Sequence, residues 1–260
     1  MLNKFYVRTG KRIFDLTSAT CGVIFLSPVF VLAALAVKLT GPGPVLFSHK
    51  RIGLNFKPFF THKFRTMVVG ADKNGSAITT SGDARITPIG RLLRTTKLDE
   101  LPQLVNVLIG DMSLVGPRPE VEQYVEMFRE EYKTVLSVRP GITDYAAIEY
   151  RNEEEILQRL GGEAPEQLGS WTARRLDSGT AGQLGGGTAA QLGSEAAGRL
   201  DGQKQIGGGE RRYATPQEAY VKEILPAKIA LYKKYIAEQS FLTDLKIIAK
   251  TLSKVVGWTS

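Results

Sequence analysis

The residues best suited to chemistry are two adjacent carboxylates, Asp99 and Glu100, in the segment 98–104. Proline is tolerated only in the first turn of a helix, so Pro102 places Asp99 near a helix N-terminus. Free backbone N–H groups and the positive end of the helix dipole meet there, which predicts a lowered pKa for Asp99 and a place for phosphate. An ordinary helix N-cap is the alternative role for Asp99, and the spacing alone favours it.

Basic residues in neighbouring segments shift that balance towards a site for anions. Arg118 lies between Pro117 and Pro119, which stiffen its backbone, and its planar guanidinium suits a diphosphate. A plain turn with an exposed arginine explains the same three residues equally well. The other cations that could converge with Arg118 are Lys63, Arg65, Arg91, Arg94 and Arg139.

The sequence offers many oxygen ligands for a metal ion but few nitrogen or sulfur ligands. His49, His62 and Cys21 are the whole set of histidines and cysteines, so we expect no zinc site. Carboxylates beside phosphates suit Mg²⁺, which keeps several waters and needs one or two protein ligands. The sequence has no Gly-rich phosphate loop and no motif that supports a Ser-His-Asp triad. Asp111 could support a metal or hold an arginine, and Asp83 is a weaker candidate of the same kind.

Charge and composition narrow the classes of partner. The 260 residues carry a formal net charge of +8, which makes nucleic acid, anionic lipid and phosphorylated small molecules the candidates. The hydrophobic content of 43% is that of an ordinary soluble protein and excludes a carrier with many membrane spans. One cysteine allows no disulfide within the chain and fits a reducing cytosolic setting.

One apolar segment breaks this pattern, because no charged residue occurs from Leu16 to Val37. Its length fits a membrane helix and is long for a signal peptide, and no clear cleavage site follows it. Pro28, after Ser27, removes a helical hydrogen bond and favours a kink. Positive charges flank the segment on both sides, and such charges stay in the cytoplasm. Both flanks therefore prefer the same side, which a bent re-entrant helix satisfies. A single kinked span is the alternative, and physical arguments alone leave the two about even.

The remaining segments alternate helices with rigid turns. Apolar residues at helical spacing predict two helical pieces over 87–110 and another helix over 120–136. From about Gly161 to Gly209, leucine recurs every eight residues beside glycine, which buries too little surface to offset ordering of the chain. We interpret this octad segment as a disordered surface insertion that carries no chemistry.

The helical pattern returns over 221–256, and the last helix combines an apolar stripe with lysines spaced four residues apart. Lys246, Lys250 and Lys254 form that line. The pattern is typical of an amphipathic helix on an anionic membrane surface. An ordinary surface helix with a solvated lysine face is the alternative, and the apolar N-terminal segment favours the membrane.

Longer motifs connect these segments. They are Lys11–Asp15 (KRIFD), Ser27–Pro28, Arg51–Gly53 (RIG), Lys63–Met67 (KFRTM), Asp83–Arg94 (DARITPIGRLLR), Leu98–Glu120 (LDELPQLVNVLIGDMSLVGPRPE), Arg139–Thr143 (RPGIT), Ser240 and Asp244. Together they resemble the bacterial sugar transferases, the small monotopic polyprenyl-phosphate sugar-1-phosphate transferases. The resemblance covers nearly the whole chain except the octad segment, and its central motifs are long and specific.

The resemblance implies an α+β fold that is mostly helical, with a re-entrant N-terminal helix broken at Ser27–Pro28. Residues 1–40 would then form the membrane anchor and 41–160 the catalytic core. Residues 161–210 would be the disordered octad insertion. Residues 211–260 would be amphipathic helices that complete the catalytic domain.

The reaction implied by the resemblance moves a sugar-1-phosphate from a UDP-sugar to polyprenyl (undecaprenyl) phosphate. Asp99 would attack the sugar-bearing phosphorus and release UMP, and the lipid phosphate would then take the sugar phosphate from the aspartate. Glu100 would tune either the binding of the metal ion or the transfer of a proton, and the motif does not distinguish the two roles. Asp99, Glu100 and Asp111 would hold Mg²⁺ as the cofactor, and the diphosphate would be neutralised by Lys63, Arg65, Arg94, Arg118 and Arg139.

The implied setting is the cytoplasmic face of the bacterial inner membrane, at the first membrane step of surface polysaccharide or glycoconjugate synthesis. Expected partners are the UDP-sugar, polyprenyl phosphate and anionic lipid, with no nucleic acid, and a second copy of the chain is a further candidate. Many relatives continue the Pro-Gly-Ile-Thr turn with Gly-Trp-Ala where this chain has Asp144, Tyr145 and Ala146, which weakens any inference about the sugar. A metal-dependent phosphatase of the same lipids and a non-enzymatic membrane adaptor are the competing functions.

Overall fold

The computed structural model describes residues 6–71, 79, 83–161 and 212–256. They form two compact units, each built from segments far apart in the sequence. The first unit comprises residues 1–69, 86–151 and 231–260, and the second comprises residues 70–85 and 152–230. The octad segment, which we interpreted as disordered, lies outside the described residues except for Gly161, which ends a helix.

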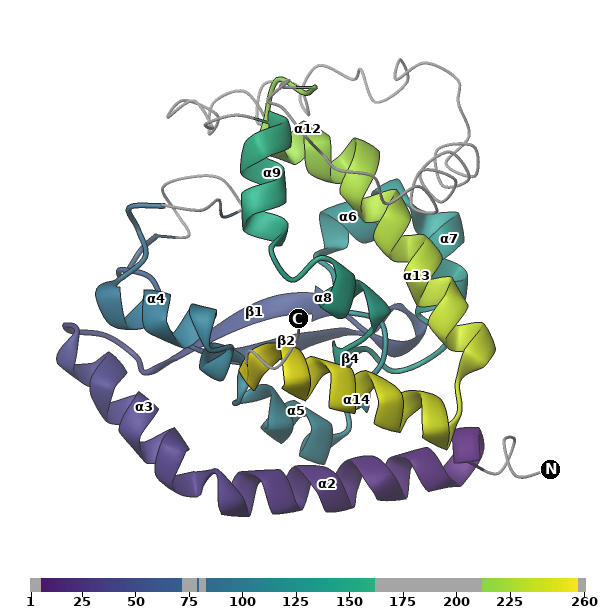
Figure 1. Ribbon diagram of the computed structural model, residues 1–260, viewed down its shortest axis with the longest axis horizontal. Coiled ribbons are helices and arrows are strands. Elements are labelled where there is room, and N and C mark those ends of the chain that lie inside the picture. The colour runs from purple at the N-terminus through teal and green to yellow at the C-terminus, as the bar shows by residue number, and fades with distance from the viewer. Residues whose placement is uncertain (1–5, 72–78, 80–82, 162–211, 257–260) are drawn as a thin grey trace. The chain divides into compact units, whose positions relative to one another are not determined.

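Two consecutive helices, α2 (Lys11–Phe25) and α3 (Ser27–Leu39), follow a short π-helical turn at Tyr6–Gly10. They meet at a bend of 62° (Figure 1), which confirms the kink predicted at the Ser-Pro pair. Pro28 lies in the first turn of α3, where its missing N–H costs nothing, and the Ser27 hydroxyl donates to the Ile24 carbonyl. No single helix in the described residues is long and apolar enough to cross a membrane, whereas this bent pair together meets both criteria.

The first two turns of α2 are attached to three other elements of the same unit by their charged residues. Lys11 bonds to α14 (Phe241–Val256), Arg12 to the end of α5 (Gln103–Ile109), and Asp15 to β3 (Ser113–Val115). The contacts are Lys11 Nζ to Asp244 Oδ2 at 2.6 Å, Arg12 to the carbonyls of Val107 at 2.6 Å and Leu108 at 3.1 Å, and Asp15 accepting from Ser113 Oγ at 2.7 Å and from Leu114 N at 3.0 Å. The KRIFD motif therefore fixes α2 to the body of the unit.

Two small sheets complete the first unit. Strand β1 (Leu46–Ile52) pairs antiparallel with β2 (Pro58–Phe64), and β3 pairs parallel with β4 (Gly141–Thr143). The buried side chain of Asn106 in α5 accepts from the His62 N–H and donates to the Phe60 carbonyl, which attaches β2 to α5. These contacts fix the middle of β2 relative to the middle of α5.

Short helices connect the strands. The two helical pieces predicted over 87–110 are α4 (Pro88–Thr95) and α5. The single helix predicted over 120–136 is wrong, because α6 (Glu122–Met127) and α7 (Arg129–Val135) are separated by non-helical Phe128 at φ −122° and ψ 39°. After β4 comes α8 (Tyr145–Glu149), and the end of α13 (Leu225–Glu238) and α14 close the unit.

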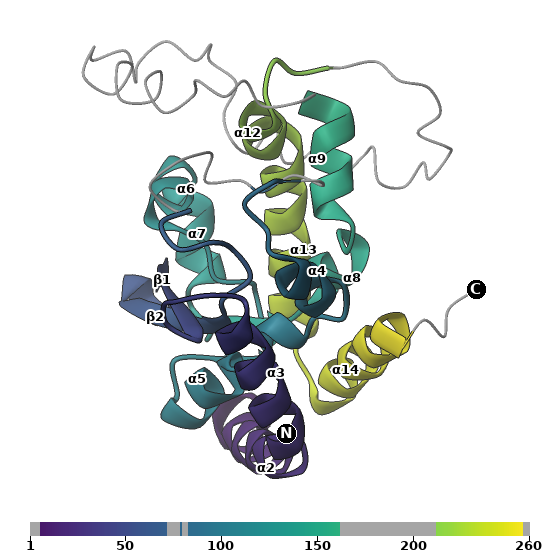
Figure 2. The ribbon, with the colours of Figure 1, turned by 90° about the vertical axis from the view of Figure 1, so that its left-hand side faces the viewer.

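The core of the first unit lies where α2 and α3 meet the sheets and α5. Ala19 of α2 packs with Leu104 and Val107 of α5, and α2 and α5 lie side by side in two views (Figures 1 and 2). Ala33 and Val37 of α3 pack instead against residues of β2 and α4. The unit is thus mostly helical with small sheets, in agreement with the expected α+β class.

The second unit contains α9 (Glu153–Gly161), α12 (Pro216–Ala219), a π-helical turn at Tyr220–Ile224 and the start of α13. Its buried Lys228 forms an ion pair with Glu153 at 3.1 Å and donates to the Tyr220 hydroxyl at 3.2 Å. Both partners belong to the second unit, so the Lys228 ammonium group has a counter-charge and a hydrogen bond within that unit.

Asp244 offers a test of how α2 is held. Its fully buried carboxylate accepts from Lys11, from the Tyr6 hydroxyl at 2.5 Å and from the Tyr235 hydroxyl at 2.8 Å. We expect Asp244→Ala to lower the free energy of unfolding by about 3 kcal/mol, because it leaves the partly buried Lys11 ammonium group without its counter-charge and two tyrosine hydroxyls without their acceptor. Denaturant unfolding followed by circular dichroism measures this. Lys250→Ala, on the exposed side of the same helix, is the control, and equal stability of the two variants would contradict the role of Asp244.

Candidate functional site

Asp99 and Glu100 lie in a single 3₁₀ turn, Leu98–Glu100, one turn before α5 begins. Lys97 precedes the turn in the left-handed region, at φ 58°. Pro102 is the N-cap position of α5, which confirms that the helix starts at this proline. The N-cap positions of the 3₁₀ turn and of α5 are Lys97 and Pro102, so the alternative in which Asp99 is an ordinary N-cap is not realised.

Glu100 is held by two cations from other parts of the chain (β2 and the turn after β3). Lys63 Nζ, at the end of β2, lies 2.7 Å from Glu100 Oε1. The Arg118 guanidinium makes a bidentate contact with both carboxylate oxygens, one at 3.2 Å. Burial by itself would raise the pKa of Glu100, but the charges and hydrogen bonds of Arg118 and Lys63 hold that pKa well below its usual range. Burial and the Arg118 charge in turn lower the pKa of Lys63, against the opposing effect of Glu100.

Asp99 lies beside this group in a different electrostatic state. Its side chain is buried, and among the described residues Oδ1 has no hydrogen-bond partner. Burial and the Glu100 charge raise the pKa of Asp99, while Lys63, Lys97 and Arg94 oppose the rise. The lowered pKa expected from a helix N-terminus is therefore wrong, because desolvation of the carboxylate outweighs the nearby positive charge.

Two further cations act on Asp99 through their charge. Arg94, predicted from the sequence, lies in the last turn of α4, and its Nε donates to Thr66 Oγ1 at 2.9 Å. Lys97 was not predicted as part of the site, although its place two residues before Asp99 was a usable signal. The positive charges of Lys63, Arg94, Lys97 and Arg118 exceed what Asp99 and Glu100 can neutralise.

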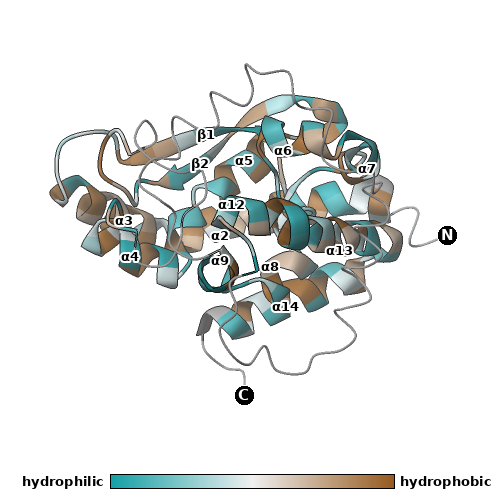
Figure 3. Cartoon of the chain, turned by 90° about the horizontal axis from the view of Figure 1, so that it is seen from above, coloured by the Kyte–Doolittle hydropathy of each residue, from teal (hydrophilic) through white to brown (hydrophobic). Residues whose placement is uncertain are grey.

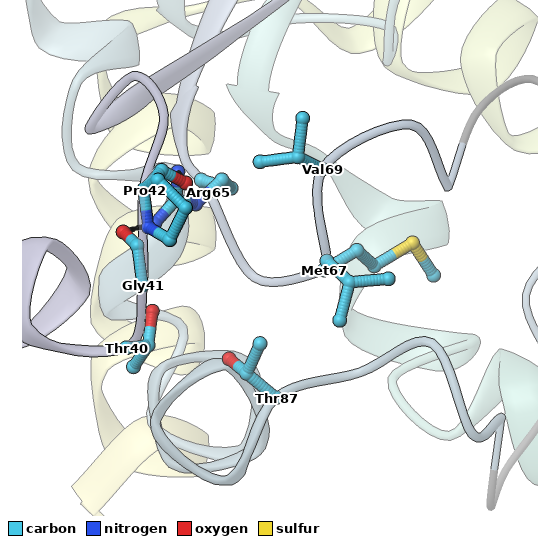
Figure 4. Close-up of a pocket in the computed structure, with 8 residues that line it drawn as sticks. Thr40, Gly41, Pro42, Arg65, Met67, Val69 and Thr87 are labelled. Carbon is cyan, nitrogen blue, oxygen red and sulfur yellow. Dashed lines mark hydrogen bonds between the residues drawn. The ribbon is translucent and has the colours of Figure 1, made fainter.

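Arg65 is engaged at the end of α3. Its guanidinium donates to the carbonyls of Val37 and Gly41, each at 3.1 Å, and of Pro42 at 2.9 Å. It thereby binds carbonyl groups in the last turn of α3 and just after it, where a cation is favourable. Arg65 also lines a small cavity (Figure 4) with Thr40, Gly41, Pro42, Met67, Val68, Val69 and Thr87.

Arg139 and Asp111 lie at the opposite end of α5 from Asp99. Arg139 Nε donates to the Gly110 carbonyl at 2.9 Å, and Asp111 is the next residue. The seven residues of α5 span roughly 10 Å, which separates both side chains from the turn that precedes the helix. In the part of the chain that the structure describes, no three His, Cys, Asp or Glu residues are grouped as metal ligands. Asp111 thus does not join Asp99 and Glu100, and Asp83 in the second unit pairs with Arg85 at 2.7 Å.

Comparisons with known proteins give independent evidence on the family to which this chain is similar. A family model described as bacterial sugar transferase matches residues 6–164. The UDP-glucose:undecaprenyl-phosphate glucose-1-phosphate transferase of Escherichia coli (strain K12) is 44% identical over 157 residues, which are 59% of this chain and 34% of that protein. A protein of the same name from Caulobacter vibrioides is 45% identical over 150 residues, 56% of each chain.

A third relative carries a different sugar in its name. The UDP-N-acetylgalactosamine-undecaprenyl-phosphate N-acetylgalactosaminephosphotransferase of Aeromonas hydrophila is 40% identical over 141 residues, 53% of this chain and 33% of that protein. The chain thus spans between 33% and 56% of the length of these three relatives. Similar identity to proteins named for glucose and for N-acetylgalactosamine leaves the sugar open.

The opposite pKa shifts of the two carboxylates predict opposite effects on stability. Because the pKa of Asp99 is raised in the folded state, its ionised form opposes folding at every pH above that value. We expect Asp99→Asn to be at least as stable as the unmodified protein at pH 8, with the difference shrinking as pH falls. Glu100 has a lowered pKa, so its contribution is present above its unfolded pKa and is lost as pH falls through the folded value.

We expect Glu100→Gln to lower the free energy of unfolding at pH 8 by about 2 kcal/mol, because Lys63 and Arg118 lose their counter-charge. Denaturant unfolding of both variants at pH 8 measures the two effects. At pH 5, which still lies above the ordinary pKa of a glutamate, the loss caused by Glu100→Gln should persist. Equal destabilisation by Asp99→Asn and Glu100→Gln at pH 8 would contradict the assigned charge states.

Proposed function

Because the chain belongs to the bacterial sugar transferase family, we propose that it moves a sugar-1-phosphate from a UDP-sugar to undecaprenyl phosphate and releases UMP. The names of the relatives supply both substrate classes. The observation that carries the proposal is the buried Asp99 Oδ1, which has no hydrogen-bond partner in the described part of the chain and lies next to a carboxylate that two cations hold.

Asp99 is the nucleophile in this proposal. An Asp99 oxygen bonds to the sugar-bearing phosphorus, and the bond from that phosphorus to the bridging oxygen breaks, so that UMP leaves with the electron pair. An oxygen of undecaprenyl phosphate then bonds to the same phosphorus and frees the Asp99 carboxylate. Neither step requires a proton from the protein, and a carboxylate oxygen without a hydrogen bond has its lone pairs available for attack.

Arg118, Lys63, Arg94 and Lys97 bind and neutralise the diphosphate. The Arg118 fork matches two phosphate oxygens in the same way that it matches the Glu100 carboxylate, while Lys63 acts as a point charge. Glu100 keeps Lys63 and Arg118 in place before the substrate arrives, so little reorganisation remains when charge develops. This is the main role that we assign to Glu100.

The donor set fits Mg²⁺ at the turn that carries Asp99 and Glu100. The second Asp99 oxygen and the Glu100 carboxylate are hard ligands, and Mg²⁺ takes one or two carboxylates while substrate phosphates and waters supply the rest. Asp99 and Glu100 are the residues that would hold the ion. When bound, it would neutralise negative charge on the diphosphate.

We place the protein at the cytoplasmic face of the bacterial inner membrane, with α2 and α3 entering and leaving on the same side. Exposed apolar side chains along this bent pair support the proposal: Ile24, Phe25, Val31, Leu32, Leu35 and Leu39. On α14, exposed Leu242, Leu245 and Leu252 alternate with lysines, and Figure 3 shows apolar and polar bands on this helix. A re-entrant anchor and an interfacial helix would hold the site where a lipid phosphate arrives. The pathway would be surface polysaccharide or glycoconjugate synthesis.

Steady-state release of UMP tests the reaction. With a UDP-sugar and undecaprenyl phosphate, we expect Asp99→Asn to lower kcat by about a thousandfold or more, because the amide cannot form the covalent bond. Glu126→Gln, an exposed acidic residue of α6, is the matched control and should retain full activity. Sustained UMP release without undecaprenyl phosphate would contradict the transfer and favour a hydrolase.

The pH dependence tests the charge state of Asp99. Because attack requires the ionised carboxylate, kcat should fall as pH decreases through the raised pKa of Asp99. Lys97 opposes that rise, so Lys97→Asn should raise the pKa further and move the acid limb of the profile to higher pH. Asparagine tolerates the left-handed backbone at this position. The charge-matched control is Lys57→Asn, and an acid limb shared by Lys97→Asn and Lys57→Asn would refute the assignment.

A further inference from the structure

Asp144 is a buried carboxylate outside the group around Asp99, with 1% of its surface exposed. It follows β4 and is the N-cap of α8, where Oδ1 accepts from the Ala147 N–H at 2.6 Å. Its other oxygen, Oδ2, accepts from the backbone N–H of Arg118 at 2.8 Å. One carboxylate therefore joins the start of α8 to the turn that carries Arg118.

The helix cap alone does not require an aspartate. A serine or threonine hydroxyl caps a helix equally well, and α8 has five residues. The second oxygen serves the Pro117-Arg118-Pro119 turn, in which neither proline has an N–H to donate. The Arg118 N–H is thus the sole backbone donor of these three residues, and Asp144 accepts it.

We infer that Asp144 is a positioning residue for the reaction, because it fixes the backbone from which the Arg118 guanidinium reaches Glu100 and the diphosphate. The inference rests on the proposed function. The same turn is also held by the Gly141 N–H, which donates to the Pro117 carbonyl at 2.9 Å, so loss of Asp144 would loosen the turn without releasing it. A small shift of the Arg118 guanidinium misaligns its two N–H donors with the phosphate oxygens. Displacements of this kind reduce the rate of the catalysed reaction strongly.

Asp144→Ser separates the two roles of this side chain. The serine hydroxyl can still accept from the Ala147 N–H and keep the helix cap, but it is too short to reach Arg118 as well. We expect kcat/KM for the UDP-sugar to fall about tenfold, and the melting temperature to fall slightly because one hydrogen bond is lost. Thr215→Ala is the matched control, because it removes the N-cap of α12, where Thr215 Oγ1 accepts from the Glu218 N–H. It should lower stability slightly and leave kcat/KM unchanged.

A double-mutant cycle tests whether Asp144 acts through Arg118. In an Arg118→Ala background we expect Asp144→Ser to change kcat/KM by less than about twofold, because the group that it positions is gone. Should Arg118→Ala fail to fold, Arg118→Lys takes its place, since it keeps a positive charge for Glu100 and lacks the fork.

The outcomes separate this inference from the proposed function. Equal losses from Asp144→Ser in both backgrounds, or no loss in the unmodified background, would overturn the positioning role and leave the transferase assignment intact. Absence of UMP release from the unmodified protein with every UDP-sugar tested would overturn both.

Discussion

The site depends on two adjacent carboxylates, Asp99 and Glu100, that lie in one buried turn but have different charged neighbours. Like charges this close repel strongly away from water, so both can be ionised only if cations compensate them. Lys63 and Arg118 bond to Glu100 and lower its pKa, whereas no side chain bonds to Asp99 Oδ1 among the described residues, and burial raises the pKa of Asp99. Charge compensation at Glu100 therefore leaves the neighbouring carboxylate reactive.

Much of the first unit serves to bring these side chains to the same place. Asn106 attaches β2 to α5 through Phe60 and His62, and thereby brings the next residue, Lys63, to the turn before that helix. The conformation of the turn after β3 brings Arg118 from the other side. Lys11, Arg12 and Asp15 attach the bent helix pair to the same group of elements. If that pair enters the membrane, as we propose, these contacts set the distance from the lipid surface to Asp99.

The sequence predicted local features better than tertiary contacts. Proline positions predicted the bend at Ser27–Pro28 and the start of α5, because proline acts on the backbone next to it. The stiff Pro-Arg-Pro turn left open whether Arg118 binds an anion or is an exposed arginine in a plain turn, and in the structure its guanidinium contacts the Glu100 carboxylate. The sign of the Asp99 pKa shift could not be derived, because it depends on burial by residues distant in sequence. Arg139 and Asp111 were grouped with Asp99 because sequence motifs carry no information about which end of α5 each one occupies. Asp144 was noted only as a departure from relatives, since its contact reaches a backbone N–H 26 residues away.

The most direct test of the account is the search for a covalent intermediate. The protein is mixed with a UDP-sugar in the absence of undecaprenyl phosphate, quenched, digested and examined by mass spectrometry. We predict a phosphosugar on Asp99, formed in amounts equal to the UMP released and discharged when undecaprenyl phosphate is added. UMP formation with Asp99 unmodified, or with the adduct on another side chain, would contradict the account.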